Sequence, residues 1–201
     1  MEDERLFPAT IMPDKDCWHA LWPSPEAVLR SVGMDSGMGV VDLCCGDGHF
    51  SMRMCQLVHP GNTWALDLDA KLLAEAEQVC RGCPNFIPVR ADARDLCRFI
   101  REPVNFSSSR TRFKGCPIRP NYQRRSTLRS SGVDVSRSLT GIARHVRKPR
   151  CLAQPRGQDT SLRMEPEDVR ALVEPAGFRL EKVVEMGPYH YAAVFLKLED
   201  I

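Results

Sequence analysis

The chain has 201 residues, of which 43% are hydrophobic and 27% are charged, and its formal net charge is +2. These values are typical of one soluble globular domain with a sizeable core. No run of about 18 apolar residues occurs, so we expect no membrane span, and the acidic first residues lack the apolar core of a signal peptide. Nine cysteines at irregular spacing indicate reduced thiols and a cytoplasmic location.

The charge is unevenly distributed along the chain. Residues 105–155 contain ten arginines and two lysines against one acid, Asp134, which makes a net charge of +11. The rest of the chain carries −9. Residues 105–155 are therefore a basic segment in an otherwise acidic chain.

Residues 1–35 are predicted to form a helical lead-in to the main domain. A short amphipathic helix is expected at 16–22. A second helix should begin at Ser24 as N-cap with Pro25 at its first position, and Gly33 should end it. Its buried face would consist of Val28, Leu29 and Val32.

The stretch 40–50 is the strongest local signal. An apolar run closed by Asp42 predicts a buried strand at 39–43, and Gly46 and Gly48 then permit a sharp turn. Apolar residues at helical spacing predict a helix over 48–59. A strand, a glycine turn and a helix are the first unit of a doubly wound nucleotide-binding sheet.

Two further strands each end near an acid. The strand expected at 63–68 carries Asp67, 25 residues after Asp42, which is a spacing typical of a ribose-binding acid. The strand expected at 86–90 is followed by Asp92. Asp67 could instead ligate a metal with Asp69, although no third ligand lies nearby in sequence.

The helix between these two strands is expected at 70–80. Its predicted apolar face consists of Leu72, Leu73, Ala76, Val79 and Cys80. Cys80 and Cys83 form a C-x-x-C pair that could be half of a zinc site, a redox pair or two incidental thiols. Incidental thiols are favoured because no second ligand pair occurs at zinc spacing.

The order of Asp42, Cys44, Gly46 and Gly48 resembles motif I of class I S-adenosylmethionine-dependent methyltransferases, with Cys44 in place of the first glycine. The resemblance covers about residues 36–100 and implies an α/β, Rossmann-like doubly wound sheet that binds S-adenosylmethionine. It implies a ribose role for Asp67 and an adenine role for Asp92. It assigns no catalytic base and no metal. The implied cofactor-binding residues are Asp42, Cys44, Gly46, Gly48, Asp67, Leu68, Asp92 and Ala93.

In this family, helices before the first strand often fold over the cofactor. Trp18, His19 and Trp22 would then line a lid. Alternatively, they form an aromatic cap on the core.

The family pattern requires a fourth and a fifth strand where this chain is basic and rich in serine. A strand begins at 103–106, but no four consecutive apolar residues occur from 107 to 150. The segment 105–155 therefore interrupts a domain expected over 36–201, and strands four and five are predicted to be disrupted. Three interpretations remain open: a basic nucleic-acid arm, a disordered insertion, or coding sequence read in a shifted frame.

Order is predicted to return after residue 164. Pro166 should open a helix with Val169, Leu172 and Val173 on its apolar face. Strands are expected at 179–186 and 189–198, joined at Gly187-Pro188, with an antiparallel final strand at the sheet edge. The stretch 189–191 could face a substrate or pack at that edge.

The leading functional hypothesis is methyl transfer from S-adenosylmethionine to a small-molecule acceptor, without a membrane partner. The alternative is a non-catalytic protein of this fold that binds RNA through residues 107–153.

Overall fold

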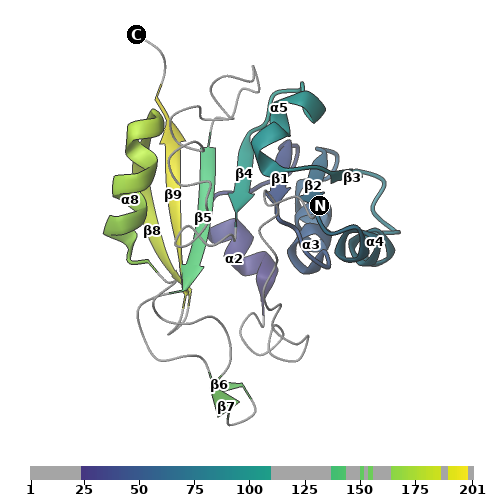
Figure 1. The fold of residues 1–201 in the computed structure, drawn as a ribbon, viewed down its shortest axis with the longest axis horizontal. Coiled ribbons are helices and arrows are strands. Elements are labelled where there is room, and N and C mark those ends of the chain that lie inside the picture. The colour runs from purple at the N-terminus through teal and green to yellow at the C-terminus, as the bar shows by residue number, and fades with distance from the viewer. Residues whose placement is uncertain are drawn as a thin grey trace, which may run out of the picture.

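The computed structural model describes six parts of the chain: residues 24–109, 137–143, 150–151, 154–155, 164–186 and 190–198. Figure 1 shows their arrangement. The predictions for the helix at 16–22, for Trp18, His19 and Trp22, and for the Gly187-Pro188 junction lie outside the described residues.

The centre of the fold is a seven-stranded sheet in the order β3-β2-β1-β4-β5-β9-β8. Strands β3, β2, β1, β4 and β5 are parallel to their neighbours, whereas β9 is antiparallel to both β5 and β8. The strand bounds are β1 Val40–Leu43, β2 Thr63–Asp67, β3 Phe86–Arg90, β4 Phe106–Ser109, β5 Arg137–Ala143, β8 Phe178–Met186 and β9 His190–Lys197. The predicted α/β, doubly wound sheet is therefore confirmed.

Helices cover both faces of this sheet. The helical segments are α2 Pro25–Ser31, α3 His49–Val58, α4 Ala70–Val79, the 3₁₀ turn η1 Ala93–Asp95, α5 Leu96–Phe99, α8 Pro166–Val173 and the 3₁₀ turn η3 Glu174–Ala176. Two short strands, β6 Arg150–Cys151 and β7 Gln154–Pro155, form a separate antiparallel pair. Figure 1 shows this pair away from the main sheet.

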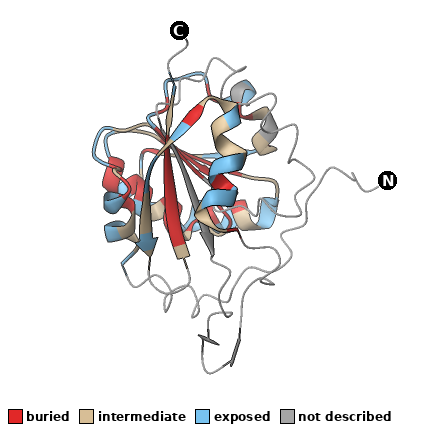
Figure 2. Ribbon diagram, turned by 90° about the vertical axis from the view of Figure 1, so that its left-hand side faces the viewer, coloured by how far each residue is buried: buried red, intermediate tan, exposed pale blue. Residues whose placement is uncertain are grey.

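The alternation of side chains along β1 supplies two apolar cores. Val41 and Leu43 belong to the core that includes Leu96 of α5 and Val169 of α8. Val40 faces the opposite side and belongs to the core formed with α2 and α3. Figure 2 shows buried residues along the strands and exposed residues on the outer sides of the helices. The sheet thus lies between two helical layers.

The predicted start and end of the first described helix are confirmed, but its predicted side-chain cap is not. Pro25 occupies the first turn of α2, and Gly33 has φ +93° after its last turn, a conformation that favours glycine. Leu29 and Val32 are buried as predicted, and Val28 is half-buried. Ser24 stands at the N-cap position without a side-chain capping hydrogen bond.

The predicted apolar face of α4 is correct at four positions and wrong at one. Leu73, Ala76 and Cys80 are buried and Leu72 is half-buried, but Val79 is 41% exposed. Val79 is rotated away from the line that Leu73, Ala76 and Cys80 form at helical spacing, so it reaches solvent near the helix end.

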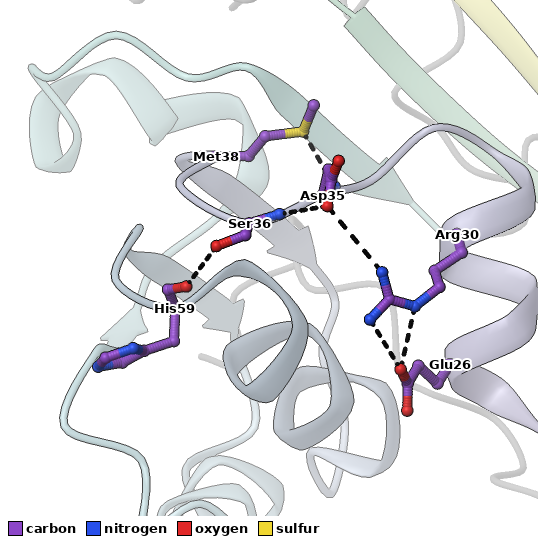
Figure 3. A network of polar contacts seen from close by, with 6 residues as sticks. All are labelled: Glu26, Arg30, Asp35, Ser36, Met38 and His59. Carbon is purple, nitrogen blue, oxygen red and sulfur yellow. Dashed lines mark hydrogen bonds and ion pairs between the residues drawn. The ribbon is translucent and has the colours of Figure 1, made fainter.

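A polar network holds the connection between α2 and β1 (Figure 3). Ser36 Oγ donates to the carbonyl of His59 at 2.8 Å, and Arg30 of α2 lies 4.0 Å from Asp35. The Gly37 N–H donates to the Val58 carbonyl at 2.8 Å. The exposed ion pair contributes little stability. The hydrogen bonds to the end of α3 therefore contribute most of the polar stabilisation of the segment before β1.

The prediction that strands four and five are disrupted is wrong. β4 lies between β1 and β5, and β5 pairs with β9 over Arg137–Ala143, so the sheet has no gap. Ser107 and Ser108 are only 2% and 3% exposed in β4. Strand pairing uses backbone groups, which serine supplies as well as valine does, so a polar sequence can still complete the ladder.

The C-terminal helix and strands form as predicted, but the two strands have exchanged their predicted positions in the sheet. α8 begins at Pro166 and buries Val169, and Gly177 follows η3 with φ +87°. The final strand, β9, lies inside the sheet, and β8 forms the edge instead. β9 is the more apolar of the two, so burial on both faces favours it at the inner position.

Tyr191 belongs to the core and not to a substrate surface. Its side chain is fully buried, and its hydroxyl donates to the Met164 carbonyl at 2.7 Å. The hydrogen bond ties β9 to the segment that precedes α8. His190 is half-buried and pairs with Ala143 of β5.

Candidate functional site

The turn after β1 has an unusual backbone. Cys44, Gly46 and Gly48 have φ values of +56°, +61° and +81°, all in the left-handed region. Glycine adopts this region without strain, whereas a cysteine there is uncommon. Cys44 is exposed, and the turn leads directly into α3. The positive φ values therefore explain the glycine pattern in the sequence.

Gly48 also permits close packing of α3 against α4. A Cβ atom at this position would lie 2.8 Å from the Cα and Cβ atoms of Ala76. No real Cβ contact is that short, so only glycine fits without movement of the helices. Gly48 therefore has two roles: it adopts the left-handed backbone of the turn, and it allows α3 to pack closely against α4.

Asp42 is fully buried, and it faces α3. Its Oδ2 accepts a hydrogen bond from Ser51 Oγ at 2.7 Å, and Ser51 is also fully buried. The pair ties the end of β1 to the first turns of the following helix. Sequence analysis missed Ser51, although its position nine residues after Asp42, on the buried side of the predicted helix, was a usable signal.

Asp67 connects the end of β2 with the glycine turn. Its Oδ2 accepts from the Gly46 N–H at 2.9 Å, and its Oδ1 accepts from the Asp69 N–H at 2.9 Å. An ionised carboxylate has about four acceptor positions, so these two hydrogen bonds leave roughly two. These hydrogen bonds hold the half-buried carboxylate at the edge of the sheet. Its remaining acceptor positions could accept hydrogen bonds from the two hydroxyls of a diol.

Asp69 has a structural role. It is the N-cap of α4, and its Oδ1 accepts from Lys71 N at 2.8 Å and Leu72 N at 3.4 Å. Among the described residues, no group of three His, Cys, Asp or Glu side chains has the geometry to hold a metal ion. The Asp67 and Asp69 carboxylates instead hold backbone N–H groups.

The remaining predicted residues follow β2 and β3. Leu68 is half-buried between the two aspartates. Asp92 is half-buried, its carbonyl accepts from Asp95 N at 2.8 Å, and Ala93 packs against the core at the start of η1. Asp95 forms an exposed ion pair with Arg98, at 3.5 Å.

The topology brings these residues to one edge. β1, β2 and β3 are parallel neighbours, so their carboxyl ends meet at the same side of the sheet. The chain runs outward from β1 to β3 on one side and continues at β4 on the other, which places the switch point between β1 and β4. Ligands of open α/β sheets bind at such a switch point.

The comparisons with known proteins agree with this geometry. The sequence model of a family described as "Methyltransferase domain" matches residues 40–121, which include β1 to β4. A comparison with curated protein sequences gives no match.

Solved structures show the same fold. A SAM-dependent methyltransferase from Aquifex aeolicus is 20% identical with a TM-score of 0.71, over 87% of this chain and 90% of that chain. Magnesium protoporphyrin IX methyltransferase from Synechocystis, with bound SAM, is 16% identical with a TM-score of 0.60, over 90% and 80%. Fibrillarin from Aeropyrum pernix is 16% identical with a TM-score of 0.56, over 85% and 73%.

The sheet order, the glycine turn and the family match together define a class I methyltransferase fold. Residues 40–121 match the model of a methyltransferase domain family, and the chain shares its fold with SAM-dependent methyltransferases of known structure. No described helix has the length and apolar character needed to cross a membrane.

Proposed function

We propose that the chain binds S-adenosylmethionine at the carboxyl ends of β1, β2 and β3 and transfers its methyl group to a small-molecule acceptor. The observation that carries this proposal is the Asp67 carboxylate, which two backbone N–H groups hold beside the glycine turn. Its remaining acceptor positions match the two hydroxyls of a ribose. Asp92, half-buried after β3, would accept from the adenine amino group.

The chain's residues would act by holding and aligning the cofactor. When bound, the cofactor supplies an electrophilic methyl sulfonium. The left-handed turn at Cys44, Gly46 and Gly48 would bring the backbone close to the cofactor, and Leu68 and Ala93 directly follow Asp67 and Asp92 in the chain. Asp42 is fully buried, so its proposed role is to hold the turn and α3 through Ser51. Methyl transfer depends mainly on such alignment.

The test is isothermal titration calorimetry with S-adenosylmethionine, followed by a methyl-transfer assay against candidate small molecules. We expect saturable binding with one site per chain. A folded wild-type chain that releases no heat and shows no thermal shift with the cofactor would contradict the proposal.

The alternative function is RNA binding through residues 107–153. The observation that favours it is the net charge of +11 on residues 105–155, most of which lie outside the described residues. Filter binding over a series of salt concentrations separates the two functions. A steep loss of affinity with salt, without cofactor binding, supports the RNA-binding module.

The proposed location is cytoplasmic. This proposal rests on the cysteine content, because nine cysteines at irregular spacing are typical of reduced thiols in a reducing compartment. Fractionation of cells that express the protein would test this.

A further inference from the structure

The backbone donors of the glycine turn are mostly used within the chain itself. Four of the five N–H groups of residues 45–49 donate to acceptors in the described part of the chain. The four pairs are Cys45 N to Leu66 O at 3.0 Å, Gly46 N to Asp67 Oδ2 at 2.9 Å, Gly48 N to Cys45 O at 3.2 Å and His49 N to Asp47 Oδ1 at 3.3 Å. In dinucleotide-binding folds, such a turn and the helix after it offer free N–H groups to a pyrophosphate. This turn therefore has few donors left for an anion.

Asp47 also places a negative charge at the start of α3. Its Oδ1 accepts from the N–H of His49, the first residue of α3, because the N-cap residue Gly48 has no side chain that could do so. The N-terminus of a helix carries roughly +0.5 of an elementary charge, whereas an ionised carboxylate carries a full negative charge. The carboxylate therefore outweighs the helix dipole, and the start of α3 repels anions.

A second carboxylate is held at the same turn. Asp67 is hydrogen-bonded to the N–H of Gly46, and Asp47 is the next residue after Gly46. Neither aspartate forms an ion pair with a basic side chain in the part of the chain that the structure describes. Both side chains are half-buried, so solvent screens their charges less than it would at an exposed site. The turn therefore attracts cations.

We propose that Asp47 determines the ligand specificity of the turn: it favours a nucleoside that carries a positive charge and excludes nucleotides that carry phosphates. This inference rests on the proposed function, since S-adenosylmethionine has a sulfonium and an ammonium group against one carboxylate. The ribose is common to both kinds of ligand, so a ribose-binding Asp67 does not distinguish them. Asp47 distinguishes them by its charge.

The test replaces the charge of Asp47 and keeps its hydrogen-bond acceptor. Asp47→Asn retains an Oδ1 atom for the His49 N–H. Calorimetry on the full chain compares three adenine compounds: S-adenosylmethionine as the cation, 5′-methylthioadenosine as the neutral nucleoside and ADP as the anion. We expect the variant to bind the cation at least about five-fold more weakly and ADP at least about five-fold more tightly, with the neutral nucleoside changed by less than about two-fold.

The comparison of three ligands separates specificity from stability. If Asp47 only stabilised the turn, its replacement would change the three affinities together. Glu167→Gln is the matched control, because it removes one exposed negative charge from the first turn of α8. In Figure 1, α8 lies beside β8, and three strands separate β8 from β1. This control should leave all three affinities within about two-fold of the wild-type values.

A second measurement uses the wild-type chain and does not depend on folding of a variant. Raising the ionic strength about tenfold should weaken binding of S-adenosylmethionine several-fold more than binding of 5′-methylthioadenosine, because salt screens the attraction between charges. Equal salt dependence of the two compounds, or equal changes of all three affinities in Asp47→Asn, would overturn the role of Asp47 and leave cofactor binding in place. A folded wild-type chain that binds neither nucleoside would overturn the proposed function, and this inference with it.

Discussion

The Gly46 N–H donates to Asp67 Oδ2 at 2.9 Å, and this hydrogen bond joins the glycine turn after β1 to the end of β2. The other carboxylate oxygen accepts from Asp69 N at the same distance. Both bonds are to backbone groups of ordered elements, so the carboxylate has one orientation before any ligand arrives. A group that is already oriented loses little entropy when a ligand binds.

The first prediction is that Asp67→Ala greatly weakens binding of S-adenosylmethionine. Loss of two hydrogen bonds from a charged acceptor costs about 2–4 kcal/mol, which corresponds to roughly 30- to 1,000-fold in affinity. Calorimetry on the purified variant measures the loss. Asp69→Asn is the control, because asparagine is an equally good N-cap and should leave affinity within a few-fold. Equal losses in both variants would remove Asp67 from the ribose role.

The second prediction concerns Gly48. In Gly48→Ala the new methyl group would meet Ala76 at 2.8 Å, and the left-handed backbone would be strained. Together these effects should lower the free energy of unfolding by roughly 2–5 kcal/mol, measured by urea denaturation. Gly82→Ala is the matched control, since a Cβ there meets nothing within 4 Å. Unfolding energies that change equally in the two variants would contradict the packing argument.

The third prediction concerns the buried hydrogen bond between Ser51 and Asp42. Ser51→Ala leaves a fully buried carboxylate with one donor fewer, which should cost about 1–3 kcal/mol in unfolding free energy. Ser31→Ala also removes a hydroxyl hydrogen bond, but Ser31 is exposed, so its effect should stay within about 0.5 kcal/mol. If urea denaturation gives the same small change for both, the pair does not stabilise the fold.

The fourth prediction uses Cys44 as a reporter of the site. This thiol is exposed in the turn that the proposed cofactor would cover, whereas Cys83 lies at the opposite edge. Saturating S-adenosylhomocysteine should therefore slow alkylation of Cys44 by iodoacetamide at least several-fold and leave the rate at Cys83 unchanged. The sites are read by fragmentation of peptides 31–53 and 82–90. Protection of both thiols would indicate general stiffening of the chain and not occupancy of the turn.

Sequence patterns predicted the elements of the first half of the fold well, because local signals agree there. The bounds predicted for the strand at 86–90 equal those of β3, and the helix predicted at 70–80 is α4 within one residue. The acid near the end of each strand and the glycines of the turn are local features with direct backbone consequences. The positions of Asp42, Gly46 and Asp67 at one edge follow from parallel pairing of the strands.

Features that depend on tertiary contacts were not predictable in this way. β4 and β5 are held by pairing with β1 and β9, so the polar residues Ser107 and Ser108 did not reveal a central strand. The close approach of Gly48 to Ala76 depends on how α3 packs against α4, which spacing along one helix does not encode. The inner place of β9 likewise follows from competition with β8 for the buried position.

The last prediction concerns the coding sequence of the central segment. A strand between two parallel neighbours is buried on both faces and is usually a continuous apolar run, yet β4 has Ser107 and Ser108 at 2% and 3% exposure. Polar residues at such positions forgo apolar burial worth about 25 cal/mol per Å². We therefore predict that a shifted reading frame across codons 107–153 encodes an apolar strand, an amphipathic helix, a Pro-Gly-Gly-like turn and a second apolar strand. Reading the nucleotide sequence in three frames checks this, and a protein translated in that frame should unfold at a higher temperature and gain further stability from S-adenosylmethionine. The absence of those elements from every frame would refute the prediction, and the serines would then be native residues of the central strand.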